Sequence, residues 1–288
     1  MSQAPLTHAR DAVLRRNNVQ VRGHDLGQPA LVFVNGFGGE QGMWRSVAPF
    51  FAAGRRVVLF DHVGTGGSQG CALAGPRYAS LQGYADDLLE VCDAVGESDA
   101  VAVAHSCGAT MAMLAAIRSP ASFRHLVLVA PSPCFRNDGS YLGGFERQDL
   151  DTLLQAMELD YRHWARQLAP MIMGHPERPE LARELESALN RIDPAIARQF
   201  ARLCFGGDDR QLLARLTTPT TILQAAEDNI VPEVVGEFMQ ESIPRCELVR
   251  LRATGHFPHL SAPQQVVQAL RELLDESWAE TQPAALGH

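Results

Sequence analysis

Short apolar runs bounded by Gly, Pro or Asp alternate along the chain with longer amphipathic segments, and this alternation limits the possible folds most strongly. Six apolar runs are expected to be strands: 30–35, 56–60, 99–104, 125–130, 220–224 and 246–251. The segments between them with patterns typical of helices are 42–52, 80–95, 106–119, 232–242 and 263–277. Because continuously apolar strands are covered on both faces, the pattern predicts βα units around a mostly parallel sheet.

About ninety residues without a strand pattern separate the run ending near Ala130 from the run beginning near Thr220. Six residues of this insertion recur at the three- and four-residue spacing of one helix face: Leu150, Leu153, Leu154, Met157, Tyr161 and Trp164. Helical patterns also cover 178–190 and 194–205, each with a Pro near its start. We expect a cap of four helices on an α/β core, with flexible tails at 1–15 and 280–288.

Charge and cysteine content exclude several classes of function. The 288 residues include 25 Arg, no Lys and 33 acidic residues, so the net charge of −8 disfavours nucleic acids and anionic membranes as partners. The six Cys lack the spacing of a zinc site, and we expect neither a metal nor an organic cofactor. No segment has the roughly 18 apolar residues of a membrane span, and no signal peptide is recognisable. We expect a cytoplasmic protein.

A candidate nucleophile follows the expected strand 99–104. The turn between this strand and the next helix contains Ala104, His105, Ser106, Cys107 and Gly108. It resembles the G-x-S-x-G turn, whose small residues let the chain bend sharply and leave the Ser hydroxyl exposed above the sheet. Ala104 replaces the first Gly, which is the smallest possible departure. The alternative is an ordinary junction in which Ser106 caps the helix. His105 is expected to support the loop below the sheet.

A Ser nucleophile needs a base to remove its proton, and after a turn of this type the partners follow along the chain in the order Ser, Asp or Glu, His. The sequence contains both partners in this order. Asp228 comes after the expected strand 220–224, and Glu227 is the competing carboxylate. Either residue could instead be a solvated loop charge or a helix cap. His256 comes after the last strand and is the expected general base, whereas His259 is expected to have a supporting or surface position.

Two backbone N–H groups are candidates for stabilising the oxyanion that carbonyl attack creates. One belongs to Cys107, next to the nucleophile, and the other to Phe37, in the glycine-rich loop after 30–35. That loop lacks the Lys-Ser/Thr pair of a phosphate-binding P-loop. Asp61, after 56–60, is interpreted as a structural residue that binds the backbone of its own loop.

The chain resembles the α/β-hydrolase superfamily, and within it the bacterial RsbQ-like regulators and the plant karrikin and strigolactone receptors. The resemblance covers about residues 16–274, and its most specific motifs lie in the insertion: 132–138 (SPCFRND), 143–146 (GGFE) and 193–200 (DPAIARQF). It implies an α/β-hydrolase fold, with a mostly parallel doubly wound sheet and an inserted four-helix lid. The core would then comprise 16–133 and 207–279, and the lid 134–206.

The resemblance also implies site residues and a function. By position it places the triad and the oxyanion donors on the residues chosen above, and it adds an apolar pocket lined by Phe37, Phe135, Trp164 and Phe205. One departure is Asn35, which stands where many hydrolases have His. We predict a serine hydrolase that cleaves a small hydrophobic ester or lactone through an acyl-enzyme. The alternative is an RsbQ-like sensor or adaptor that hydrolyses slowly or once and regulates a protein partner.

Overall fold

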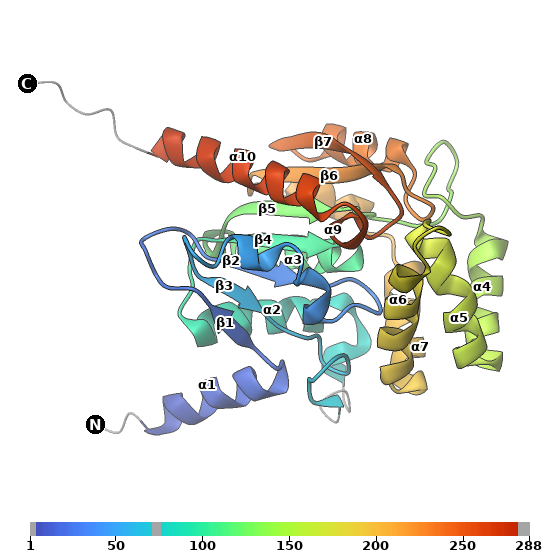
Figure 1. The fold of residues 1–288 in the computed structure, drawn as a ribbon, viewed down its shortest axis with the longest axis horizontal. Coiled ribbons are helices and arrows are strands. Elements are labelled where there is room, and N and C mark those ends of the chain that lie inside the picture. The colour runs from blue at the N-terminus through green and yellow to red at the C-terminus, as the bar shows by residue number, and fades with distance from the viewer. Residues whose placement is uncertain (1–3, 71–75, 282–288) are drawn as a thin grey trace, which may run out of the picture.

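Seven strands form one sheet in the computed structural model, which describes residues 4–70 and 76–281 (Figure 1). The strands are β1 (Gln20–Arg22), β2 (Leu31–Val34), β3 (Val57–Leu59), β4 (Ala100–His105), β5 (Phe123–Val129), β6 (Thr220–Glu227) and β7 (Cys246–Thr254). Their order in the sheet is β1-β3-β2-β4-β5-β6-β7, and every neighbouring pair is parallel except β1 and β3. The predicted mostly parallel, doubly wound sheet is confirmed.

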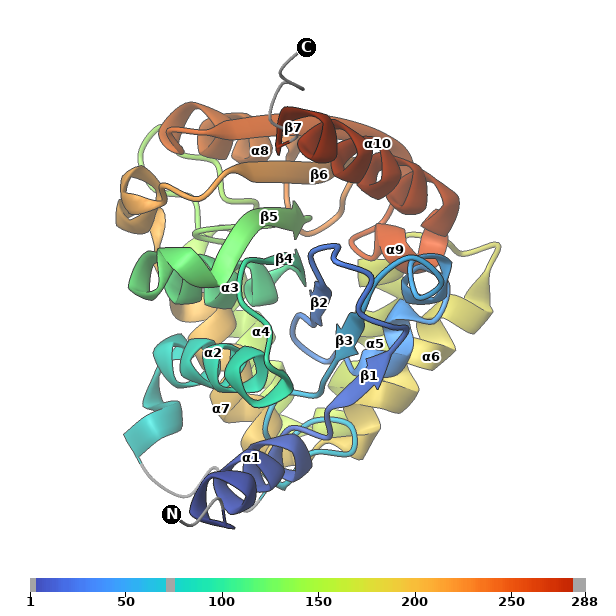
Figure 2. The same ribbon diagram turned by 90° about the vertical axis from the view of Figure 1, so that its left-hand side faces the viewer.

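Both faces of the sheet are buried, because successive side chains of a strand point to opposite sides. On β2, Val32 and Val34 belong to one apolar core and Leu31 and Phe33 to the other. The first core includes α2 (Leu81–Val95), α3 (Cys107–Arg118) and α8 (Glu233–Ser242), and the second includes α10 (Pro263–Thr281). Figure 2 shows α2 and α3 on one side of the sheet and α10 on the other. This double coverage explains why the strands are apolar at every position.

Four helices between β5 and β6 form the predicted lid at the carboxyl ends of the parallel strands (Figure 1). They are α4 (Arg147–Leu159), α5 (Tyr161–Met173), α6 (Pro179–Arg191) and α7 (Pro194–Gly206). The apolar stripe predicted from Leu150 to Trp164 is divided between α4 and α5. The break is at Asp160, whose side chain accepts a hydrogen bond from the backbone N–H of His163 at 3.0 Å and so caps α5.

The expected N-terminal tail is wrong for residues 4–15, which belong to helix α1 (Ala4–Arg16). This helix is attached to the core by tertiary contacts: Val13 and Leu14 pack against the larger apolar core, and Arg16 pairs with Asp87 at 3.0 Å and with Glu90 at 2.6 Å. At the other end, α10 continues to Thr281, and the remainder of the expected C-terminal tail, 282–288, lies outside the described residues.

The helix expected at 42–52 is also wrong. Two short 3-10 turns replace it, at Gln41–Trp44 and Ala48–Phe50. Pro49 lies in the second turn and cannot donate the backbone hydrogen bond that a continuous α-helix would need. The short helix α9 (Pro258–Ser261) follows β7. Across the described ranges, no helix combines the length and apolar composition that crossing a membrane requires.

Candidate active site

Ser106 occupies a strained bend between β4 and α3. Its backbone angles are φ 52° and ψ −126°, a region that residues with a side chain rarely adopt. The bend is possible because glycines surround it: a Cβ on Gly36 would lie 2.9 Å from the Ser106 Cβ, and one on Gly108 would lie 2.3 Å from the Asn35 carbonyl oxygen. The Ser106 side chain makes no capping hydrogen bond to the helix, so the alternative interpretation as a helix cap is wrong.

The structure brings Ser106, His256 and Asp228 together as one hydrogen-bonded chain. His256 Nε2 lies 2.8 Å from Ser106 Oγ, and His256 Nδ1 lies 2.8 Å from Asp228 Oδ2. Ser106 is 6% exposed and His256 is 4% exposed, so these two members of the hydrogen-bonded triad are almost inaccessible to solvent. With the proton on Nδ1, His256 donates to Asp228 and accepts from the Ser106 hydroxyl.

Asp228 is held in place by its own loop. Its second carboxylate oxygen, Oδ1, accepts hydrogen bonds from the backbone N–H groups of Ile230 at 2.8 Å and Val231 at 3.0 Å. The competing carboxylate, Glu227, is exposed and accepts a hydrogen bond from the Thr254 hydroxyl at 3.1 Å. Of the two acidic residues weighed from the sequence, Asp228 is therefore the one bonded to His256.

Two further histidines lie beside His256, and neither has a hydrogen bond to the Ser106 hydroxyl, which pairs with His256. His105 Nε2–H donates to the His256 carbonyl oxygen at 2.8 Å, so His105 supports the loop that carries His256. Burial lowers the pKa of His105 well below its ordinary value, which keeps the ring neutral. His259 is fully buried and stacks on Trp44 at 4.2 Å, and burial lowers its pKa to about 3. The expected supporting positions agree with these contacts, although His259 is not at the surface.

The two candidate oxyanion donors lie at the same edge of the sheet as Ser106. Cys107 is the first residue of α3, and Phe37 follows β2. Neither backbone N–H has an acceptor within residues 4–70 and 76–281. The Phe37 loop is anchored through Asn35, whose carbonyl accepts from His62 Nε2 at 2.7 Å and whose side chain donates to the Phe60 carbonyl at 3.2 Å. Both N–H groups therefore remain candidates for the oxyanion donors.

Aromatic side chains form a continuous cluster above this loop. The centroid of the Phe37 ring lies 6.1 Å from that of Trp164 and 5.7 Å from that of Phe205. The centroids of Phe205 and Phe135 are 5.2 Å apart. All four side chains predicted to line the pocket therefore belong to one cluster. Phe200 was not among the predicted pocket residues, although its ring centroid lies 5.7 Å from that of Phe37. Its place on the apolar stripe of α7, three residues after buried Ala197 and four before buried Cys204, was the signal that could have identified it.

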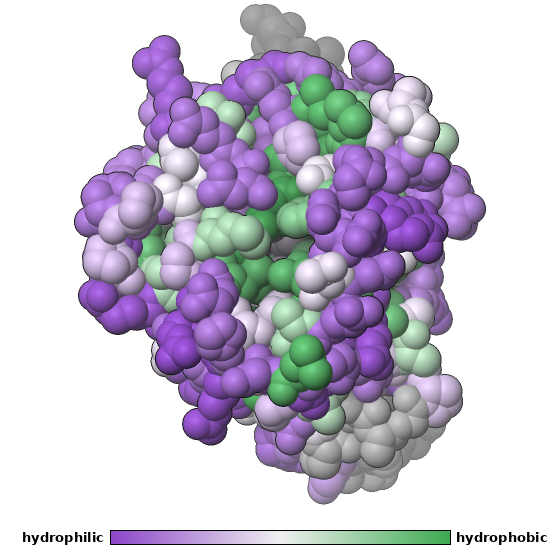
Figure 3. Space-filling model, turned by 90° about the vertical axis from the view of Figure 1, so that its right-hand side faces the viewer, coloured by the Kyte–Doolittle hydropathy of each residue, from purple (hydrophilic) through white to green (hydrophobic). Residues whose placement is uncertain are grey.

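The lid has an apolar groove between α4 and α5. Its volume is about 400 Å³, and its walls include Leu153 and Ala156 from α4 and Trp164, Leu168 and Met171 from α5. Figure 3 shows apolar side chains gathered around a hollow on the face of the molecule where the lid lies. Trp164 borders the groove and also contacts Phe37, so a single side chain links the lid surface to the loop beside Ser106.

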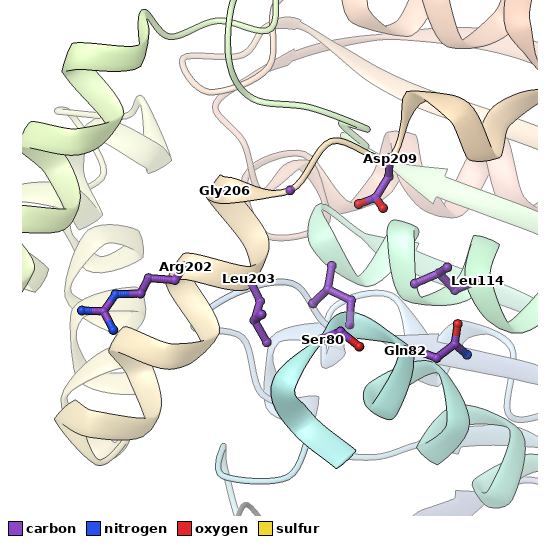
Figure 4. Close-up of a pocket in the computed structure, with 9 residues that line it drawn as sticks. Ser80, Gln82, Leu114, Arg202, Leu203, Gly206 and Asp209 are labelled. Carbon is purple, nitrogen blue, oxygen red and sulfur yellow. The ribbon is translucent and has the colours of Figure 1, made fainter. Parts of the chain in front are cut away.

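A second cavity, of about 360 Å³, lies where α7 meets α2 and α3 (Figure 4). Ser80, Gln82, Leu114, Leu203 and Asp209 are among the residues that line it. Burial raises the pKa of the Asp209 carboxyl. None of the residues that line this cavity belongs to the Ser106 site or to the aromatic cluster, so the cavity is separate from the candidate active site.

Within the described part of the chain, no group of three or more His, Cys, Asp or Glu residues has the arrangement of a metal site.

Comparison with known proteins gives three consistent results. A profile described as "Alpha/beta hydrolase family" matches residues 31–269. A strigolactone esterase of Arabidopsis thaliana is 36% identical over 263 residues, which cover 91% of this chain and 97% of that protein. Karrikin insensitive 2 receptor IA of Petunia hybrida is 34% identical over 245 residues, which cover 85% of this chain and 89% of that protein. The solved structure of a hydrolase from Oleispira antarctica is similar with a TM-score of 0.89 and 34% identity, covering 92% of this chain and 97% of that one.

Proposed function

The chain belongs to the alpha/beta hydrolase family, and from this premise we propose that it is a serine hydrolase that cleaves a small hydrophobic ester or lactone. The observation that carries the proposal is the hydrogen-bonded chain from Asp228 through His256 to Ser106, with heavy-atom distances of 2.8 Å at both links. The strained backbone of Ser106 supports the same role, because strain of this kind is kept where a nucleophile must be held out from the chain.

In the proposed first step, His256 Nε2 takes the hydroxyl proton while Ser106 Oγ attacks the substrate carbonyl carbon. Asp228 keeps the other imidazole proton on Nδ1 and stabilises the imidazolium that forms. The imidazolium then gives its proton to the leaving alkoxide, and an acyl-enzyme remains on Ser106. In the second step, His256 takes a proton from a water molecule whose oxygen attacks the acyl carbon. The bond from that carbon to Ser106 Oγ then breaks, and His256 returns the proton to Ser106 Oγ.

The backbone N–H groups of Phe37 and Cys107 are proposed to bind the oxyanion of each tetrahedral intermediate. One support for this role is that both groups lack an acceptor within the described residues. Another is their place: Cys107 follows Ser106, and Phe37 follows Gly36, where a Cβ would lie 2.9 Å from the Ser106 Cβ. One such donor contributes about 3–4 kcal/mol to transition-state stabilisation in serine hydrolases where it has been removed.

The proposed substrate class follows from the surroundings of Ser106. The side chains of Phe37, Trp164 and Phe205 offer rings rather than charges, so they favour a small apolar acyl or alcohol group over a charged one. The relatives named as a strigolactone esterase and a karrikin receptor agree with a small-molecule ligand.

Hydrolysis of p-nitrophenyl acetate, p-nitrophenyl butyrate and a butenolide lactone tests the proposal, with mass spectrometry of the peptide that contains Ser106. We expect many turnovers by the wild type and none by Ser106→Ala. Ser132→Ala is the matched control, because Ser132 is also buried and its hydroxyl donates to a backbone carbonyl, that of Cys134. Equal activity of the wild type and Ser106→Ala would refute the role of Ser106.

A second candidate function is a receptor whose hydrolysis is slow or stops after one turnover, with the occupied lid binding a regulatory protein. The similarity to the Petunia hybrida receptor over 89% of that protein favours this candidate. The same assay separates the two functions. Continuous turnover supports the hydrolase, whereas a single burst with a persistent adduct on Ser106 supports the receptor.

A further inference from the structure

The C-terminal turn of lid helix α5 lies directly against the loops that carry Asp228 and His256. Gly174 ends the helix with φ 67°, and its N–H donates to the Pro170 carbonyl at 3.1 Å. The carbonyls of Met171 and Ile172 come later in the last turn, where a helix has no N–H groups of its own left to offer. Their hydrogen-bond partners must therefore come from elsewhere in the protein.

The partners come from the two catalytic loops. The side-chain Nδ2 of Asn229 donates to the Met171 carbonyl at 2.9 Å, and the backbone N–H of His256 donates to the Ile172 carbonyl at 2.9 Å. One helix end thus binds the loop after β6 and the loop after β7. These two loops carry the acid and the base of the proposed triad.

Close packing shows that this junction is tight. A Cβ on Gly255 would lie 2.0 Å from the Met173 carbonyl oxygen, and a Cβ on Gly174 would lie 3.1 Å from Asn229 Nδ2. His175, just beyond the helix, adds a third connection, because its Nε2–H donates to the Thr254 carbonyl at 3.0 Å. The lid helix and the two loops therefore leave little room to move independently.

We propose that Asn229 is a positioning residue for catalysis: its hydrogen bond to Met171 fixes the acid loop to the same helix end that holds His256. Among the described residues, Asn229 makes no hydrogen bond to Ser106 or His256, and it acts through its neighbour Asp228. The inference rests on the proposed function, since it assigns Asn229 a part in the same triad. It also connects the lid to the chemistry, because displacement of α5 would shift the carboxylate and the imidazole.

The size of the effect follows from the kind of contact. Asn229 is exposed, and one side-chain hydrogen bond to a backbone carbonyl corresponds to about a threefold to tenfold change in rate if it is lost only in the productive geometry. The local bonds from Ile230 and Val231 to Asp228 remain in the variant, so a complete loss of activity is not expected.

The test compares three variants with the wild type on p-nitrophenyl acetate. Asn229→Leu removes the donor at similar size, Asn229→Gln retains an amide donor, and Asn190→Leu makes the same polar-to-apolar change on the exposed surface of α6. The kcat is expressed per active site titrated with diethyl p-nitrophenyl phosphate, which releases one p-nitrophenol per reactive serine. This correction removes any contribution from unfolded protein.

We expect Asn229→Leu to lower kcat about threefold to tenfold at unchanged KM, Asn229→Gln to restore most of the loss, and Asn190→Leu to match the wild type. Two results would overturn the inference: an unchanged kcat in Asn229→Leu, or a loss in Asn190→Leu as large as that in Asn229→Leu. If the wild type hydrolyses only the butenolide lactone, that substrate replaces the ester in the comparison. A wild type that hydrolyses neither p-nitrophenyl ester nor the lactone would refute the proposed function and this inference with it. An active wild type with a fully active Asn229→Leu would refute the inference alone.

Discussion

Replacing Gly108 by Ala should damage catalysis far more than stability. Gly108 is the second residue of α3, and a Cβ there would lie 2.3 Å from the carbonyl oxygen of Asn35. This separation is roughly 1 Å shorter than van der Waals contact. The methyl group therefore has to push Asn35 away, and Asn35 begins the loop whose Phe37 N–H is a proposed oxyanion donor. The same carbonyl oxygen accepts the 2.7 Å hydrogen bond from His62, so moving it disturbs the anchor of the loop.

The Gly108→Ala change affects the free energy of unfolding and kcat to different extents. Overpacking a core contact costs about 1–3 kcal/mol, and exchanging Gly for Ala inside a helix returns about 1 kcal/mol. The free energy of unfolding should therefore fall by about 0–2 kcal/mol, which leaves the protein folded. Displacing the Phe37 N–H removes one oxyanion donor, so kcat should fall about 10²- to 10³-fold.

Ester hydrolysis per titrated active site and urea denaturation of the same preparation measure the two effects. Gly206→Ala is the matched control, because Gly206 also lies at a helix end and a Cβ there meets no atom within 4 Å. We expect the control to retain wild-type kcat. A Gly108→Ala variant with kcat within threefold of the wild type would show that the loop does not supply an oxyanion donor at Phe37.

Three further predictions follow from single side chains. Asp228→Asn should lower kcat by about 10⁴-fold in the ester assay, because an amide favours the wrong tautomer of His256; a loss smaller than tenfold would contradict the proposed role. Phe200→Ala should lower the free energy of unfolding in urea by about 3–5 kcal/mol, because Phe200 is fully buried and stacks on Tyr84 at 4.9 Å; a change below about 1 kcal/mol would contradict this. The pKa of about 3 for buried His259, against 6.5 in the unfolded chain, means that the unfolded state binds more protons between these values. Lowering the pH from 7 to 5 should therefore cost about 2 kcal/mol at this residue, and His259→Phe should show a correspondingly weaker pH dependence of unfolding; equal pH dependence in both proteins would argue against the buried neutral ring.

The strand and helix predictions succeeded where local pattern and tertiary environment agree. The six predicted strands all exist, because strands covered on both faces are apolar at every position and stand out against amphipathic helices. The predictions failed where that signal is weak. Helix α1 is held by Arg16 and a few apolar contacts rather than by a strong apolar stripe, and β1 is a three-residue exposed edge strand. The segment 42–52 has helical spacing, but Pro49 interrupts it.

The sequence alone determined the order of the strands along the chain, the sharp turn at Ser106 and the candidate set of acids and bases, because each depends on residues close together in the chain. The choice within that set depended on tertiary structure. Glu227 and Asp228 are neighbours, and only the path of the backbone after β6 directs one carboxylate to His256 and the other to Thr254. Tertiary structure also decides the partners at the end of α5. The Met171 and Ile172 carbonyls, which have no partner within the helix, accept hydrogen bonds from loops more than fifty residues away along the chain. Contacts between distant segments form only when the whole core packs, and no local pattern records which groups will meet.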